Sequence, residues 1–213
     1  MSGLALAVAQ DLQGALDHKD TVTLAIPGGT TPAPFFDILS KARLNWARVR
    51  VMLTDERYLP ESNPRSNTGL VKRHLLQNNA TSAQMVPFYA EGVDVDEFAA
   101  QYMQPIDDCL PIDVCVLGMG ADMHTASLFP DSAELRDALD SKRPLHVVRP
   151  ASQPEARLTL TGTALASAAK TYVLIVGADK KAAFARAQGE TSTMIAPIRS
   201  VFGDRTSIYW ADK

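Results

Sequence analysis

The segment Leu117–Pro130 carries the side chains best suited to acid–base chemistry. It reads LGMGADMHTASLFP and extends an apolar run. His124 lies two positions after Asp122, and a histidine near a carboxylate is a natural general base at neutral pH. A Ser127 nucleophile activated by His124 is an alternative, although the segment lacks a Gly-x-Ser-x-Gly elbow. A histidine held by a structural hydrogen bond is the non-catalytic interpretation.

A second segment, PGGTTP at Pro27–Pro32, has the composition of an anion-binding loop. Gly28 and Gly29 let the backbone approach a ligand closely. Thr30 or Thr31 is expected to cap the following helix, whose free N–H groups and positive dipole end favour a phosphate. The segment lacks the lysine of a Walker loop and the spacing of a dinucleotide fingerprint. A tight turn that needs glycine for its geometry alone is the alternative.

Three consecutive charged residues, Asp55-Glu56-Arg57, end another apolar run. Charges at the end of a buried strand are costly unless they are exposed, paired or functional. Taken alone, a salt-bridge cluster on the surface explains them. Three further cations stand near expected strand ends: Arg149, Arg157 and Lys180. Together with the glycine-rich loop they are able to hold a phosphate, arginine through two parallel bonds and lysine as a point charge.

The elements that position these loops are expected to form a parallel sheet. Four apolar runs end in polar or glycine-rich turns: Thr21–Ile26, Val49–Leu53, Ile112–Leu117 and Tyr172–Val176. Such runs are typical of strands covered on both faces. Helical patterns alternate with them at Pro32–Lys41, Ser66–Leu76 and Asp179–Gln188. This alternation indicates βαβ units, so ligands are expected outside the carboxyl ends of the strands.

Weaker patterns complete the expected secondary structure. Leu4, Val8, Leu12 and Leu16 recur at helical spacing and predict an amphipathic helix at the start of the chain. Three shorter stretches look like strands and are expected to join the same sheet: Leu145–Val148, Leu158–Thr161 and Ser207–Trp210. The 213 residues show no repeat and no linker, so we expect one domain over residues 1–213.

Composition excludes several classes of protein. The chain is 46% hydrophobic and 21% charged with a net charge of −3, so no basic excess points to a nucleic-acid partner. No apolar run approaches the roughly 18 residues of a membrane span, and the first residues lack the basic region of a signal peptide. Cys109 and Cys115 are too few for a disulfide scaffold. We expect a soluble, cytoplasmic protein.

Metal binding and assembly receive little support from the sequence. The histidines other than His124 are scattered without ligand spacing, at His18, His74 and His146, so we expect no metal site. No heptad repeat or long apolar stripe marks an interface. A monomer or weak homodimer is therefore the expectation.

Taken in order, these loops resemble the 6-phosphogluconolactonases, whose superfamily also contains glucosamine-6-phosphate deaminase/isomerase. The matching pieces are GGTTP at 28–32, DERY at 55–58 with Ser66-Asn67, LGMGADMHTASLFP at 117–130, RLTLT at 157–161, Gly177 with Lys180, and YWAD at 209–212. The resemblance covers nearly the whole chain. It implies a Rossmann-like open, mostly parallel sheet with helices on both faces. It also implies that no metal and no organic cofactor is needed.

The resemblance further implies hydrolysis of 6-phospho-D-glucono-1,5-lactone to 6-phospho-D-gluconate, the second step of the oxidative pentose phosphate pathway. By position, His124 matches the family's general base and Arg57 its active-site arginine. Gly28–Thr31, Arg157 and Lys180 match positions associated with the substrate phosphate, with Arg149 as an alternative to Arg157. Two further candidates come from the matching motifs, catalytic Asp55 and substrate-binding Asn67.

The implied reaction suits the residue types. Opening a lactone needs a water molecule, a base and stabilisation of negative charge. His124 would take a proton from the attacking water and return it to the departing ring oxygen. Arg57 would stabilise the oxyanion, and Asp122 would orient His124 or hold sugar hydroxyls. Contacts to the remote phosphate would position the ring.

Two residues depart from the family pattern. Met123 stands where the family usually has glycine, so it is strained if the backbone there needs a positive φ. Otherwise its side chain must occupy space near the site. Asp131 replaces a common glycine after Leu-Phe-Pro.

Three other functions remain open. A deaminase/isomerase of the same superfamily has a glutamate in the Asn-Glu-Pro that corresponds to Leu128-Phe129-Pro130, and Phe129 cannot transfer protons. A non-catalytic sugar-phosphate sensor would need an output module, for which the chain has no spare length. Hydrolysis of a different phosphorylated lactone is the third.

Overall fold

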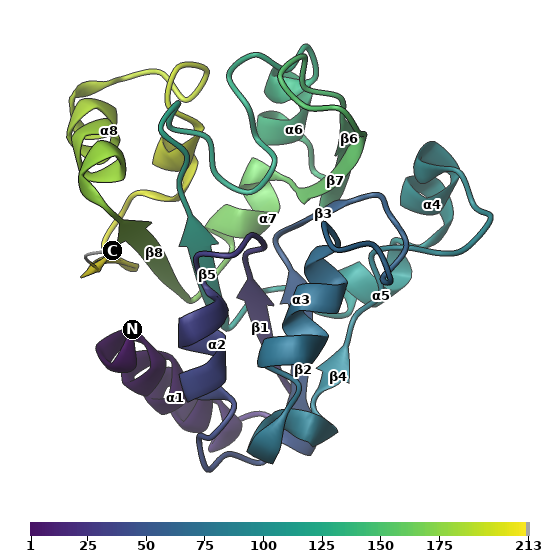
Figure 1. The fold of residues 1–213 in the computed structure, drawn as a ribbon, viewed down its shortest axis with the longest axis vertical. Helices are drawn as coiled ribbons and strands as arrows, with labels where there is room; N and C mark the ends of the chain where they lie inside the picture. The colour runs from purple at the N-terminus through teal and green to yellow at the C-terminus, as the bar shows by residue number, and fades with distance from the viewer. Residues whose placement is uncertain (212–213) are drawn as a thin grey trace.

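A six-stranded sheet runs through the centre of the molecule, with the strand order β4-β2-β1-β5-β8-β9 (Figure 1). The computed structural model describes residues 1–211, so Asp212 of the YWAD match lies outside the described residues. The strands are β1 (Val22–Ile26), β2 (Val49–Leu53), β4 (Gln84–Met85), β5 (Val114–Gly118), β8 (Lys170–Val176) and β9 (Thr206–Ala211). Every pairing within this sheet is parallel, which confirms the predicted open parallel sheet.

One helix precedes β1 and the others lie between strands, in keeping with the predicted alternation of strands and helices. They are α1 (Ser2–Leu16), α2 (Ala33–Leu39), α3 (Asn67–His74), α4 (Val95–Gln101), α5 (Gln104–Asp107), α6 (Leu135–Asp140), α7 (Gly162–Ala166) and α8 (Ala178–Gly189). Short 3-10 turns lie at Trp46–Arg48, Asn78–Ser82 and Pro197–Val201. In α1, Leu4, Val8 and Leu12 are buried as their spacing predicts. No helix among residues 1–211 is long and apolar enough to cross a membrane.

A second sheet holds two of the strands that were expected in the first. β6 (Leu145–Val148) pairs antiparallel with β7 (Arg157–Leu160), and β7 pairs antiparallel with β3 (Asp55–Arg57). The prediction that the stretches around β6 and β7 extend the main sheet is therefore wrong. An apolar pattern predicts a strand but does not identify its partner. The third such stretch, at Ser207–Trp210, does join the main sheet within β9.

Thr54 is the point at which the chain passes from the main sheet to the small one. Its backbone N–H donates to the carbonyl of Ile26 at the end of β1, over 2.9 Å. Its carbonyl accepts from the N–H of Leu160 in β7, over 2.8 Å. A single residue thus belongs to the hydrogen bonding of both sheets.

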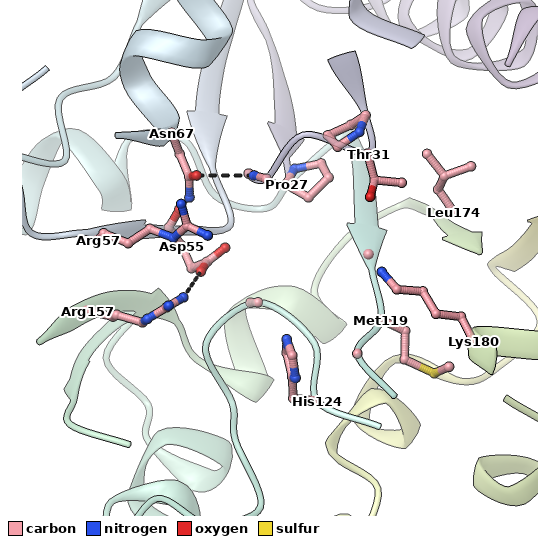
Figure 2. Close-up of a pocket in the computed structure, with 16 residues that line it drawn as sticks. Pro27, Thr31, Asp55, Arg57, Asn67, Met119, His124, Arg157, Leu174 and Lys180 are labelled. Carbon is pink, nitrogen blue, oxygen red and sulfur yellow. Dashed lines mark hydrogen bonds and ion pairs between the residues drawn. The ribbon is translucent and has the colours of Figure 1, made fainter. Parts of the chain in front are cut away.

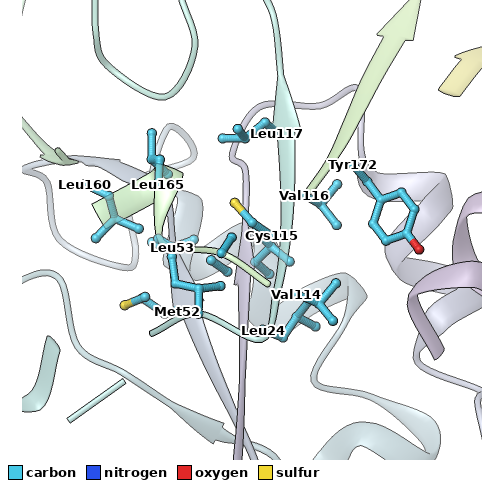
Figure 3. Close-up of a cluster of buried hydrophobic side chains, with 14 of the residues drawn as sticks. Leu24, Met52, Leu53, Val114, Cys115, Val116, Leu117, Leu160, Leu165 and Tyr172 are labelled. Carbon is cyan, nitrogen blue, oxygen red and sulfur yellow. The ribbon is translucent and has the colours of Figure 1, made fainter. Parts of the chain in front are cut away.

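A hydrophobic core joins the two sheets (Figure 3). Leu24 and Val116 come from the main sheet and Leu160 from the small one, and all three side chains are fully buried. Burying a side chain of this kind contributes roughly 1.5–3 kcal/mol. Cys115 lies in the same core, where burial raises the pKa of its thiol to about 12. It is the packing residue that its apolar surroundings predict.

Candidate active site

A cavity of about 240 Å³ opens at the carboxyl ends of the central parallel strands (Figure 2). All but two of the site residues proposed from the sequence line it. These are Asp55, Arg57, Asn67, His124, Gly28, Gly29, Thr31, Arg157 and Lys180. The two exceptions are Thr30, which is exposed, and Asp122, which contacts His124. The cavity lies where the fold of a parallel sheet places ligands.

His124 is held by Asp122 so that one ring nitrogen remains available. Its Nδ1 lies 2.5 Å from Asp122 Oδ1, which also accepts from the His124 backbone N–H over 3.3 Å. The ring packs against Phe129 with 4.1 Å between centroids. A Cβ on Gly120 would lie 2.2 Å from His124 Nδ1, so only glycine at position 120 leaves room for this arrangement. Because Nδ1 is engaged, Nε2 is the nitrogen available to a ligand.

The electrostatics of Asp122 suit this role. Burial, the largest single influence, raises the pKa of its carboxyl group. Hydrogen bonds from His124 and the charge of the imidazolium oppose burial and together hold that pKa below its ordinary value. Asp122 therefore stays ionised at neutral pH and accepts the Nδ1 proton of His124.

The loop around His124 contains two non-glycine residues in the left-handed region. Met123 has φ +68° and Ala126 has φ +48°. The strain that the sequence predicts for a positive φ at Met123 is thus present, at a cost of roughly 1–2 kcal/mol for such a residue. The N–H of Ile198 donates to the Met123 carbonyl over 3.2 Å, and Gly120 N–H donates to the His124 carbonyl over 3.0 Å. These bonds hold the loop in its strained form. At the second departure, the Asp131 carboxylate accepts from the Ser152 N–H of a neighbouring loop over 3.0 Å.

The charged run on β3 divides between two sides of the strand. Asp55 and Arg57 line the cavity, whereas Glu56 points the other way, as alternate residues of a strand do. Asp55 and Glu56 are buried, so the interpretation of this run as a surface salt-bridge cluster is wrong. Arg57 Nη1 donates to the Arg65 carbonyl over 2.7 Å, and its Nε is buried without a partner among residues 1–211.

Ser127 is not placed to act as a nucleophile with His124. It is fully buried, and its hydroxyl donates to Asp55 Oδ2 over 2.6 Å. Its backbone N–H donates to the Thr159 hydroxyl over 3.2 Å. Within residues 1–211 it makes no hydrogen bond to His124. The structure therefore uses Ser127 to hold Asp55.

The glycine-rich loop is shaped by Asn67. The Gly29 N–H donates to Asn67 Oδ1 over 3.2 Å, and a Cβ on Gly28 would lie 1.9 Å from Asn67 Cγ. Asn67 Nδ2 in turn donates to the Asp55 carbonyl over 2.9 Å. The expectation that Thr30 or Thr31 caps the next helix is wrong, because the cap residue of α2 is Pro32 and no side chain caps it. A backbone turn from Ala33 N–H to the Thr30 carbonyl, over 3.3 Å, takes that place.

Cations enter the cavity from opposite sides. In Figure 2, Arg57 and Arg157 lie on one side of His124 and Lys180 on the other, near Thr31. Burial lowers the pKa of the Lys180 amine, and the nearby Asp122 carboxylate partly opposes this. Arg157 is buried and donates to Gln153 Oε1 over 2.5 Å, while its Nε has no partner among residues 1–211.

Arg149, the alternative to Arg157, is absent from the residues that line the cavity. It is exposed and pairs with Asp96 over 2.6 Å. The structure thus brings Arg157 rather than Arg149 to the cavity. Sequence reasoning did not identify Glu56 as part of the site's support. The signal for Glu56 in the sequence is its position between Asp55 and Arg57, two candidate site residues on one strand.

Comparisons with known proteins agree with this arrangement. The sequence profile of the family "Glucosamine-6-phosphate isomerases/6-phosphogluconolactonase" matches residues 1–210. A 6-phosphogluconolactonase from Mesorhizobium japonicum is 42% identical, covering 98% of this chain and 89% of its own length. The chain belongs to the 6-phosphogluconolactonase family. The resemblance drawn from the sequence is confirmed.

Other members of the 6-phosphogluconolactonase family are similar over nearly the whole chain. One from Pseudomonas putida is 40% identical, covering 97% of this chain and 86% of its own length. A crystal structure of a 6-phosphogluconolactonase from Shewanella baltica superposes with a TM-score of 0.95 at 32% identity, covering 99% of this chain and 92% of that one. The fold and the order of the loops are therefore those of this enzyme family. Among residues 1–211, no three His, Cys, Asp or Glu side chains gather in a way that could hold a metal ion.

Proposed function

We propose that this protein hydrolyses 6-phospho-D-glucono-1,5-lactone to 6-phospho-D-gluconate. The observation that carries the proposal is the Asp122–His124 pair. Asp122 engages Nδ1 of His124, which leaves Nε2 for a ligand in a cavity with cations on both sides. Membership of the 6-phosphogluconolactonase family supports the choice of substrate. The cations suit a substrate that carries a phosphate and develops a second negative charge during reaction.

In the proposed reaction, His124 Nε2 takes a proton from a water molecule as the water oxygen attacks the lactone carbonyl carbon. Arg57 stabilises the negative charge that develops on the carbonyl oxygen. When the tetrahedral intermediate collapses, the bond from carbon to the ring oxygen breaks. The protonated His124 returns its proton to that oxygen, so the base is regenerated. Asp122 holds the imidazole and stabilises its charged form throughout.

In this proposal the phosphate lies between cations that enter the cavity from its two sides. The proposal gives its binding to Lys180, Arg157 and the Gly28–Thr31 loop, whose N–H groups, apart from that of Gly29, which donates to Asn67, suit an anion. Burial destabilises the charged form of the Lys180 amine, and a neighbouring phosphate dianion would stabilise that form again. Binding energy from this remote group would orient the ring for attack. Asp55 would act by holding Arg157, whose Nη1 lies 3.7 Å from Asp55 Oδ2.

The test is lactone hydrolysis at neutral pH with the lactone generated in situ and the spontaneous rate subtracted. His124→Ala is expected to lower kcat by a factor on the order of 10² or more, the usual contribution of a general base. His74→Ala is the matched control, because His74 also pairs with an aspartate, Asp37, over 2.9 Å but away from the cavity. No acceleration by the wild type, or an unchanged rate in His124→Ala, would contradict the proposal.

No observation favours the deaminase/isomerase reaction, because the corresponding position holds Phe129, which is buried against the His124 ring. Ligand binding without turnover in the same assay would indicate a sensor instead. We also propose a cytoplasmic location and a monomer or weak homodimer. Sedimentation of the purified protein would test the second of these.

A further inference from the structure

Glu56 is a buried carboxylate at the back of the site. It is 0% exposed and lies between the cavity-lining residues Asp55 and Arg57. Within residues 1–211 no cation pairs with it. A buried charge without a counter-ion is costly unless hydrogen bonds replace its hydration. Its presence at this position therefore needs a structural reason.

The carboxylate of Glu56 is satisfied by the first residues of α3. Oε1 accepts from the Asn67 N–H over 2.8 Å. Oε2 accepts from the Thr68 N–H over 2.8 Å and from the Ser66 hydroxyl over 3.1 Å. A negative charge is stabilised at the N-terminus of a helix, which supports the ionised form. Burial nevertheless raises the pKa of Glu56, and the backbone bonds from Asn67 and Thr68 oppose it.

These bonds fix the residue that shapes the glycine-rich loop. Asn67 is 1% exposed, and its side chain bridges the Gly29 N–H and the Asp55 carbonyl. The carboxamide lies against Gly28 so closely that no Cβ fits there. Its position depends on where the Asn67 backbone begins α3, and Glu56 Oε1 holds that backbone. A chain of direct contacts thus runs from Glu56 through Asn67 to Gly29.

We propose that Glu56 is a positioning residue that sets the phosphate-binding form of the Gly28–Gly29 loop by holding the backbone and hence the carboxamide of Asn67. The inference rests on the proposed function in that the loop is taken to bind the substrate phosphate. Glu56 does not touch the reacting atoms. Its loss therefore weakens the binding of phosphorylated ligands and leaves the chemical step unchanged.

The central variant is Glu56→Gln, which keeps the size of the side chain but offers one acceptor oxygen in place of two. The N–H groups of Asn67 and Thr68 then cannot both keep an oxygen partner. The matched control is Asp113→Asn, the same chemical change at a carboxylate that is 6% exposed and accepts a backbone N–H from Thr23 over 2.8 Å. Asp113 precedes β5 and so lies at the opposite end of the sheet from the cavity.

Steady-state kinetics give the first readout. Glu56→Gln is expected to raise KM for the phosphorylated lactone about tenfold, as the loss of one charge-assisted hydrogen bond predicts, with kcat within about twofold of the wild type. KM for unphosphorylated D-glucono-1,5-lactone is expected to stay unchanged. Asp113→Asn is expected to change neither constant, even where it lowers the melting temperature as much as Glu56→Gln does.

A binding readout separates this inference from the proposed reaction. Inorganic phosphate is expected to raise the melting temperature of the wild type and of Asp113→Asn, but much less that of Glu56→Gln. If the wild type shows this shift but no lactonase activity, the proposed reaction fails while the role of Glu56 stands. Equal shifts in the wild type and Glu56→Gln overturn the role of Glu56, as does the absence of a shift in the wild type.

Two further variants keep the inference testable if Glu56→Gln does not fold. Glu56→Asp retains both oxygens and the charge but is one methylene shorter, so it is expected to raise KM with little effect on kcat. Asn67→Ala removes the carboxamide directly, and adding a Glu56 substitution to it is expected to raise KM no further, because both act through one chain of contacts. Additive effects of the two substitutions contradict the proposed connection.

Discussion

Arg57 and Arg157 stand directly opposite each other in the antiparallel pairing of β3 with β7. Like charges in this relationship destabilise a pair of strands. Asp55 offsets part of the repulsion, with its Oδ2 3.7 Å from Arg157 Nη1. Burial, opposed by Asp55, lowers the pKa of the Arg157 guanidinium, and Arg57 lowers it further. This arrangement supports the proposal that the two cations face a negatively charged substrate.

The roles proposed for these arginines differ and can be separated. Arg57→Gln is expected to lower kcat by a factor on the order of 10²–10³, the usual effect of removing one oxyanion donor. Arg157→Gln is expected mainly to raise KM for the phosphorylated lactone. Arg65→Gln is the control, because Arg65 is a nearby exposed arginine that pairs with Glu155. An increase in KM alone for Arg57→Gln would move Arg57 from the oxyanion to the phosphate.

Met123→Gly tests the strained residue beside His124. Release of the left-handed strain gains roughly 1–2 kcal/mol, and the added freedom of glycine in the unfolded chain costs about 0.4–1 kcal/mol. Met123 also packs against the core, and these contacts are lost. The free energy of unfolding, measured with denaturant, is expected to change by less than about 1 kcal/mol. We expect kcat to fall because the loop loses rigidity, whereas a faster variant would mean that Met123 obstructs the pocket.

Asp122→Asn tests the orientation of the His124 ring. The wild-type carboxylate is ionised at neutral pH, since its pKa is held below the ordinary value, and it lies 2.5 Å from His124 Nδ1. The kcat for the phosphorylated lactone should fall as the ring loses its orientation. An unchanged kcat would remove Asp122 from the positioning of the base.

The same carboxylate links stability to pH. A carboxyl group with a lowered folded-state pKa contributes stability that is present above its unfolded-state pKa. That contribution is lost as the pH falls through the folded-state value. Asp122→Asn should therefore show a smaller loss of melting temperature on acidification than the wild type.

The lowered pKa of Lys180 predicts how the binding of a phosphorylated ligand depends on pH in the alkaline range. Its pKa is lowered by burial, so the free protein loses this positive charge at a lower pH than an exposed lysine would. A bound phosphate favours the charged form. Calorimetric affinity for 6-phosphogluconate should thus fall as the pH rises through the Lys180 pKa, and Lys180→Arg should move this fall to higher pH. Equal pH dependence in both proteins would exclude Lys180 from the phosphate site.

The parallel strands β1, β2, β5 and β8 and the loops after them could be predicted because these strands are largely buried and leave continuous apolar runs. The two-residue strand β4 leaves no such run. The small sheet could not be predicted in this way, because the pairing of β6 and β7 depends on where the chain turns into β3 after Thr54. The division of Asp55, Glu56 and Arg57 between two sides follows from strand geometry, but only once that segment is known to be a strand. The span of a single domain over residues 1–213 stays a prediction.

The passage of the chain from the main sheet to the small sheet at Thr54 affects how the molecule unfolds locally. Each sheet keeps its own ladder of hydrogen bonds, so the small sheet can exchange its amide protons while the large one stays closed. Arg57 and Arg157 are carried by the small sheet, whereas His124 and Lys180 follow strands of the large one. In the proposed function, a sugar phosphate bound between these residues would tie the two sheets together. Its binding should protect the amides of β3, β6 and β7 more than those of β1 and β5, so the substrate completes the tertiary structure of the site.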